Sequence, residues 1–333
     1  MVASSFFPLT ARFIGNTMPI TLTSPDATTV VDLTPQLGGA ISALRHEGAN
    51  VLWTPPRHTR DLKAQAPAGF ESQSEISWME SSLGGWEVLA PNAGSACTVG
   101  SSYLPFHGHA GRSKWQVDAV ARSSATLSCA MPTTGFRSSR QVQLVGNGRC
   151  EVRESLSYEG PGEHPAIWGS HLAFGDEFVD GPLRFEQNGT VVGGQLDGED
   201  RLSALTARIA EGTLTGPSTG LVYLHFRDVF PMVALINRTS GVRVTVSWNP
   251  VVFPFAWIWV ELHGTTGWPW FGSASALGVE PMSSWPAVGL SEAIFRGAPV
   301  QHFRAGESVS ADISVTVQGE PPQVTEKARP HEH

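Results

Sequence analysis

The chain alternates apolar and polar residues persistently between Trp115 and Tyr158, as in Cys150-Glu151-Val152-Arg153-Glu154-Ser155-Leu156. A period of two places successive side chains on opposite faces of a strand, so one face is apolar and the other is polar. Turn residues separate these runs, notably Gly146-Asn147-Gly148. Such segments bury their apolar side chains as antiparallel strands whose apolar face packs against another layer.

Strand patterns also dominate the rest of the sequence. Short runs rich in β-branched residues occur at 28–33, 220–226, 242–248 and 309–317. One modest helix is predicted over 201–211, and 54–82 is predicted to be a long loop with a helical turn, a type of loop that is often functional. We therefore predict an all-β fold, a large sandwich of antiparallel sheets with few short helices. Residues 1–20 are expected to form an N-terminal extension, 21–318 a single domain and 319–333 a polar tail.

Composition narrows the classes of partner. The formal net charge is −8 and no Lys/Arg-rich block occurs, which argues against nucleic acid and anionic membranes as partners. The three cysteines, Cys97, Cys129 and Cys150, have no C-x-x-C spacing and predict neither a disulfide framework nor a cysteine zinc site. The N-terminus lacks the pattern of a signal peptide, and no window has eighteen consecutive apolar residues. We expect a cytoplasmic protein; its oligomeric state is not readable from the sequence.

Three segments place ionisable side chains in apolar or glycine-rich surroundings. His107 and His109 lie in the turn of Leu104–Trp115, and His171 ends the run Trp168-Gly169-Ser170-His171. Glu280 ends the apolar run that begins at Leu277. Each histidine alone is more often structural than functional, whereas a carboxylate in an apolar strand must be solvated, paired or functional.

Two interpretations of these residues remain open on spacing alone. His107, His109, His171 and Glu280 could form a metal site, since an H-x-H motif with a distant His and Glu is similar to cupin ligation. No Glu follows the H-x-H by four or five residues, however, which departs from that pattern. Alternatively, Glu280 and a histidine could form a metal-free acid/base pair.

The order of these motifs resembles the aldose 1-epimerase (galactose mutarotase-like) superfamily, in a divergent bacterial branch. The resemblance runs from about Thr21 to Val317. It rests on Gly38-Gly39, the segment 85–92, Leu104-Pro105-Phe106-His107-Gly108, Trp168-Gly169-Ser170-His171 and Leu277-Gly278-Val279-Glu280-Pro281. It implies a galactose mutarotase-like β-supersandwich that binds a small-molecule carbohydrate in a cleft on one sheet.

The resemblance also implies roles for individual residues in interconverting the anomers of a sugar. Glu280 matches the general base, His171 the general acid and His107 the histidine that holds the anomeric end, and neither a metal nor an organic cofactor is needed. Aromatic faces stack on sugars, and polar groups near the first histidine could bind hydroxyls. The expected substrate-binding residues are His109, Arg112, Trp86, Asn92, Trp257 and Trp259.

Departures from the superfamily leave the substrate open. Where the hexose-6-phosphate branch has an arginine, this chain has Gly111, with Arg112 one position later. An acidic residue expected before the base is missing, since that region reads Ser218-Thr219-Gly220-Leu221, and the galactose branch's arginine has no match in 81–87. Two alternatives therefore stand beside the epimerase. One is a lyase or glycosidase acting on a modified sugar, with metal held by His107, His109 and His171, and the other is a non-catalytic sugar-binding protein.

Overall fold

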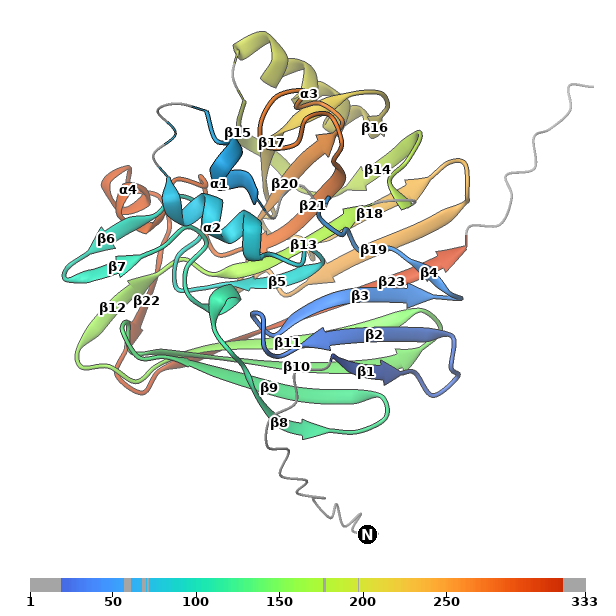
Figure 1. Cartoon of the computed structure of the whole chain (residues 1–333). Helices are drawn as coiled ribbons and strands as arrows, with labels where there is room; N and C mark the ends of the chain where they lie inside the picture. The colour runs from blue at the N-terminus through green and yellow to red at the C-terminus, as the bar shows by residue number, and fades with distance from the viewer. Residues whose placement is uncertain are drawn as a thin grey trace, which may run out of the picture.

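Two large antiparallel sheets pack face to face in the computed structural model of the chain (Figure 1). The structure describes residues 19–56, 61–67, 70, 72–175, 178–196 and 198–319. The predicted N-terminal extension and polar tail lie almost entirely outside the described residues. The all-β prediction is confirmed, because strands of the two sheets supply most of the buried core.

The first sheet has ten strands and carries the site described below. Its order is β1-β2-β3-β5-β13-β21-β20-β17-β15, and β4 pairs with β3. Its strands are β1 (Ile20–Thr23), β2 (Thr29–Thr34), β3 (Ala40–His46), β4 (Ala49–Asn50), β5 (Trp86–Leu89), β13 (Gly169–Gly175), β15 (Thr190–Gln195), β17 (Ser218–His225), β20 (Phe255–Leu262) and β21 (Ser275–Met282).

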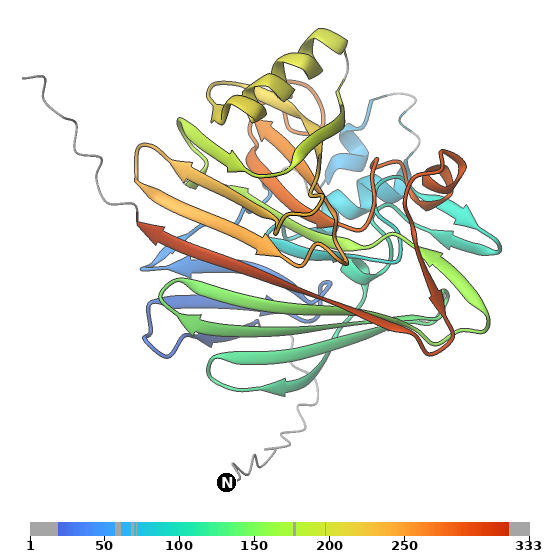
Figure 2. The ribbon, with the colours of Figure 1, turned by 180° about the vertical axis from the view of Figure 1, so that it is seen from behind.

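The second sheet has nine strands in the order β16-β14-β18-β19-β23-β11-β10-β9-β8, and Figure 2 shows it from the side opposite to Figure 1. Its strands are β8 (Gln116–Val120), β9 (Ser124–Met131), β10 (Phe136–Gly146), β11 (Arg149–Tyr158), β14 (Leu183–Gln187), β16 (Thr213–Leu214), β18 (Met232–Asn237), β19 (Val242–Trp248) and β23 (Ser308–Gly319). Side chains alternate between buried and more exposed along β10 and β11, as the period of two predicts.

Two short ribbons and several short helices complete the fold. Two small ribbons pair β6 (Cys97–Val99) with β7 (Ser102–Leu104) and β12 (Glu163–Ala166) with β22 (Gln301–Arg304). The helices are α1 (Leu62–Gln65), α2 (Gln73–Ser81), η2 (Ala110–Arg112), α3 (Glu199–Glu211) and α4 (Leu290–Phe295). None of the described helices is long and apolar enough to span a membrane.

Two local predictions are sharpened by the structure. The helix predicted over 201–211 is α3, which starts two residues earlier, with Glu199 and Asp200 in its first turn, where the helix dipole favours acidic side chains. The segment 54–82 contains α1 and α2 rather than a single helical turn. Leu62, Ile76 and Met79 of these helices are buried together in a small satellite core.

A buried ion pair joins the two sheets beneath the site. Arg140 on β10 and Glu154 on β11 are fully buried and lie 2.6 Å apart. The Arg140 guanidinium also donates to the carbonyl oxygens of Gly39 and Trp86, each at 3.0 Å, and Ser170 Oγ donates to Glu154 Oε1 at 3.0 Å. These bonds cross between the layers, so they fix β5 and β13 over the second sheet.

Candidate functional site

A row of side chains crosses the central strands of the first sheet on the face turned away from the core. Trp257 on β20 is opposite Glu280 on β21. The pairing of Leu172 with Val279 brings His171 on β13 beside Glu280 at the next position. Leu172, Val279 and Ile258 point into the main core, so their alternating neighbours His171, Glu280 and Trp257 point to the other face.

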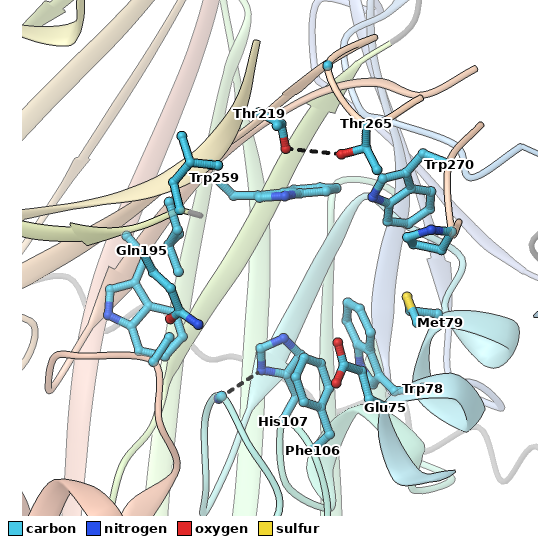
Figure 3. Close-up of a pocket in the computed structure, with 18 of the residues that line it drawn as sticks. Glu75, Trp78, Met79, Phe106, His107, Gln195, Thr219, Trp259, Thr265 and Trp270 are labelled. Carbon is cyan, nitrogen blue, oxygen red and sulfur yellow. Dashed lines mark hydrogen bonds between the residues drawn. The ribbon is translucent and has the colours of Figure 1, made fainter. Parts of the chain in front are cut away.

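A cavity of about 720 Å³ lies over this row. Its floor is the sheet, helix α2 forms one wall, and the loop between β20 and β21 forms another (Figure 3). The walls are rich in indole rings. Its lining includes Trp53, Glu75, Trp78, Met79, Phe106, His107, His171, Gln195, Arg201, Thr219, Trp257, Trp259, Thr265, Trp268, Trp270 and Glu280.

His171 and Glu280 form a buried pair in the cavity floor. His171 Nε2 lies 3.5 Å from Glu280 Oε1, and their side chains are only 8% and 3% exposed. Burial lowers the pKa of His171 to about 4 and raises the pKa of Glu280 well above its usual range. Glu280 Oε2 has no hydrogen-bond partner among the residues that the structure describes. Both shifts disfavour charge, so burial favours a neutral imidazole beside a protonated carboxyl, and one carboxyl oxygen is left to meet a ligand.

His107 is held in one tautomer at the edge of this pair. The Gly94 backbone N–H donates to His107 Nδ1 at 3.1 Å, so the proton of the neutral ring is on Nε2. Burial is the main cause that lowers the pKa of His107 well below its ordinary value, and the neighbouring His171 adds to it. The ring centroids of His107 and His171 are 5.8 Å apart. His107 is thus a fixed, uncharged hydrogen-bond donor; its φ of 59° is in the left-handed region, as at many functional positions.

Gly278 leaves the room that the Glu280 carboxylate occupies. A Cβ atom at this position would lie 2.9 Å from Glu280 Oε1 and 3.1 Å from Trp259 Cβ. Any larger residue would therefore displace the carboxylate. The glycine of the Leu277-Gly278-Val279-Glu280-Pro281 motif has a steric role in the site.

Helix α2 supplies cavity residues that the sequence alone did not identify. Trp78 packs edge-on against His107, with ring centroids 4.6 Å apart, and its ring is 5.7 Å from that of His171. Glu75 from the same helix lies beside Trp78 and His107 in Figure 3, and partial burial raises its pKa. The available signal was the length of the segment 54–82, which predicted a functional loop without indicating which side chains it would present.

Two of the expected substrate-binding residues belong to the scaffold. Trp86 is fully buried, donates from Nε1 to Ser170 Oγ and has the Arg140 guanidinium 5.6 Å from its ring. Asn92 is also fully buried, donates to the carbonyl oxygens of Ser95 and Pro105, and accepts from the Leu290 N–H. Neither side chain lines the cavity. Both are therefore corrected from ligand contacts to residues that order the core and the adjoining loops.

His109 and Arg112 also lie outside the cavity wall. His109 Nε2 is 3.2 Å from the Tyr103 carbonyl oxygen, and Arg112 donates to Ser77 Oγ and the Ser74 carbonyl of α2. Within the described residues no group of three or more His, Cys, Asp or Glu side chains is arranged to hold a metal ion. The alternative site of His107, His109 and His171 is therefore not assembled, because the turn points His109 toward the β7 strand. Of the six expected binding residues, Trp257 and Trp259 line the cavity.

Known structures share this fold. Neither a family model nor a curated protein sequence matches the chain. Among solved structures, a galactose mutarotase-like protein from Clostridium acetobutylicum is 16% identical, with a TM-score of 0.62 over 88% of this chain and 93% of that one. A galactose mutarotase related enzyme from Lactobacillus acidophilus is 14% identical, with a TM-score of 0.61 over 92% of this chain and 99% of that one.

A GalM/aldose epimerase homologue from C. elegans is similar in the same way, at 12% identity and a TM-score of 0.62 over 91% of this chain and 99% of that one. The predicted galactose mutarotase-like sandwich of antiparallel sheets is thus confirmed. At such low identities the likeness concerns the fold, and the reaction has to be inferred from the cavity.

Proposed function

We propose that this chain is an aldose 1-epimerase-like isomerase, which interconverts the anomers of a sugar by opening and reclosing its ring. The observation that carries the proposal is the buried His171–Glu280 pair, 3.5 Å apart, in the floor of an indole-rich cavity. Indole faces suit the apolar faces of a sugar ring, and a paired acid and base suit the movement of one proton. The mutarotase-like fold of the chain agrees with both features.

In the proposed reaction Glu280 is the base and His171 is the acid. Glu280 removes the proton of the C1 hydroxyl while His171 protonates the ring oxygen, and the bond between C1 and the ring oxygen breaks to give the open aldehyde. Rotation about the bond between C1 and C2 and the reverse steps give the other anomer. One proton on the pair is sufficient, because one group gives a proton as the other receives one.

Burial favours the form with the proton on Glu280 while the cavity is empty, and the reaction begins from the form with the proton on His171. Substrate hydroxyls that donate to Glu280 Oε2 would stabilise this charged form. His107 would assist by donating from Nε2 to the oxygen on C1, where negative charge develops. Neither step needs His107 to change its protonation.

The direct test is Glu280→Gln, which removes the base while nearly preserving shape. Anomer interconversion would be followed by polarimetry or exchange NMR over a panel of aldoses and corrected for the spontaneous reaction. We expect a loss of at least ~10²-fold in kcat. The matched control is Glu159→Gln, an exposed carboxylate outside the cavity, which should leave the rate unchanged.

Two results would count against the isomerase. Full activity in Glu280→Gln would remove Glu280 from the mechanism. Sugar binding by the unmodified chain without acceleration of anomer exchange for any aldose would instead identify a non-catalytic sugar-binding protein.

A further inference from the structure

The cavity is several times larger than one sugar ring. A hexose has six CHOH units, each about as large as a water molecule at ~30 Å³, so it fills roughly 180 Å³. The cavity measures about 720 Å³. Because ligand sites bury most of a ligand's surface, a single ring would leave much of this wall without contact.

The remaining space adjoins the reacting pair and is walled by indoles. The ring of Trp259 is 6.1 Å from that of His171, so the aromatic wall begins at the pair itself. Trp270 lies 6.0 Å from Trp259, and both are partly exposed in the cavity. Trp53 packs edge-on against both at 5.4 and 5.6 Å and is almost fully buried, so it supports them from behind.

This aromatic wall is fixed in place without a ligand. The loop between β20 and β21 is tied down by Glu261, which accepts hydrogen bonds from Thr219 Oγ1 at 2.9 Å and from the Thr265 N–H at 2.9 Å. Figure 3 shows Thr219 and Thr265 bonded to each other beside Trp259 and Trp270. A wall ordered in advance binds a ligand at a lower entropy cost.

The charges around the cavity favour an uncharged ligand. Glu75 and Glu280 bring two carboxyl groups to its wall, and Arg201, which is exposed on α3, is the one guanidinium among the described lining residues. The Arg112 guanidinium lies outside the cavity and donates hydrogen bonds to Ser74 and Ser77 of α2. A phosphate or carboxylate on the ligand would meet carboxyl groups at the reacting end, and the one permanent cation in the described lining, Arg201, is exposed.

From these observations we infer that the substrate is an uncharged reducing disaccharide. Its free reducing ring lies at His171 and Glu280, and its second ring stacks on Trp259 and Trp270. The placement of the reducing ring at His171 and Glu280 rests on the proposed function. The new element is that contacts to the second ring determine which substrate the chain prefers.

The test compares maltose, cellobiose and lactose with glucose and glucose 6-phosphate. We expect kcat/KM for at least one disaccharide to exceed that for glucose by ~10-fold, the value of one favourable aromatic contact, and glucose 6-phosphate to be the poorest substrate. Trp270→Ala should lower kcat/KM for that disaccharide ~10-fold more than for glucose, and Trp270→Phe should lower it less. Trp285→Ala, outside the cavity, should change neither value.

Binding to Glu280→Gln, measured by calorimetry, separates this inference from the proposed function. Tighter binding of a disaccharide than of glucose, with no turnover by the unmodified chain, would overturn the isomerase and support the disaccharide. Turnover of glucose at least as efficient as that of every disaccharide, with equal losses in Trp270→Ala, would overturn the disaccharide and leave the isomerase standing. Preference for glucose 6-phosphate would overturn the uncharged substrate.

Discussion

The three side chains with proposed catalytic roles differ in how their surroundings prepare them. Burial alone raises the pKa of Glu280, and burial is the first cause that lowers those of His171 and His107. His107 is also fixed by the Gly94 N–H, whereas His171 and Glu280 face each other. His107 is therefore suited to hold an oxygen atom, and His171 and Glu280 are suited to exchange a proton.

The pH dependence of the rate follows from these shifts. As pH falls through about 4, His171 takes up a proton while Glu280 keeps its own, so no base remains and the catalysed rate should fall. As pH rises through the raised pKa of Glu280, the pair loses its only proton and no acid remains. Polarimetry between pH 3.5 and 9, an interval of roughly five units, would measure the catalysed rate. The rate should reach a plateau in the middle of this pH range and fall on both sides of it.

His107→Gln is the control for this profile. It should lower the rate on the plateau without moving the acid limb, because His107 does not exchange a proton in the proposed reaction. An acid limb at the ordinary pKa of histidine, about 6.5, would contradict the burial of His171 as the cause.

At the scale of elements, two segments that leave the sandwich build the walls of the cavity: 54–82, which contains α1 and α2, and the loop between β20 and β21. Trp268 of the loop between β20 and β21 packs against Phe70, with ring centroids 4.5 Å apart, and donates from Nε1 to the Leu62 carbonyl of α1 at 3.3 Å. Helix α2, which belongs to the same segment as α1, presents Trp78 and Glu75 to the cavity. Each segment is ordered by the other and by the sheet, so changes in one wall should affect the other.

Glu261→Gln tests how the loop wall is held. The amide has one acceptor oxygen in place of two, so the Thr219 and Thr265 donors lose a partner, at a cost of ~1–3 kcal/mol locally. Hydrogen exchange, read by mass spectrometry, should accelerate in residues 264–273 and leave the second sheet unchanged. Glu151→Gln, an exposed carboxylate on β11, is the control. Unchanged exchange in the loop would mean that the indole packing alone orders it.

For the whole molecule, the Arg140–Glu154 pair connects the cavity floor to the opposite sheet. Arg140 bonds to carbonyl oxygens of the first sheet, and Ser170, the neighbour of His171, bonds to Glu154. Such a pair contributes mainly through the penalty of leaving one charge unpaired in the core. It positions β13, and with it the acid of the proposed reaction.

Arg140→Met should lower the free energy of unfolding by ~3–5 kcal/mol, since it leaves Glu154 buried without its partner. Urea denaturation would measure the change. The double variant Arg140→Met with Glu154→Leu should recover part of the loss, because no buried charge is left unpaired. A double variant as unstable as the sum of its single changes would show that the ion pair itself is not the source of the stability.

Local sequence pattern was sufficient for the fold class and for singling out three residues that line the cavity. The period of two in 115–158 and the β-branched runs elsewhere depend on neighbours within a strand, so they predict strands without knowledge of the fold. His107, His171 and Glu280 could be singled out because an ionisable residue in apolar surroundings requires a partner or a function. The resemblance to aldose 1-epimerases then supplied their roles as expectations.

The cavity walls were decided only by tertiary structure. Trp86 and Trp257 both lie on central strands, yet the first faces the core and the second faces the cavity, because register and layer decide the face. His109 and Arg112 follow His107 closely, but the turn points them elsewhere. Trp268 and Leu62 meet across 206 residues of sequence, and no local pattern encodes a contact between segments so far apart. The sequence therefore determined which side chains could do chemistry, and the packing of distant segments decided which of them share a cavity.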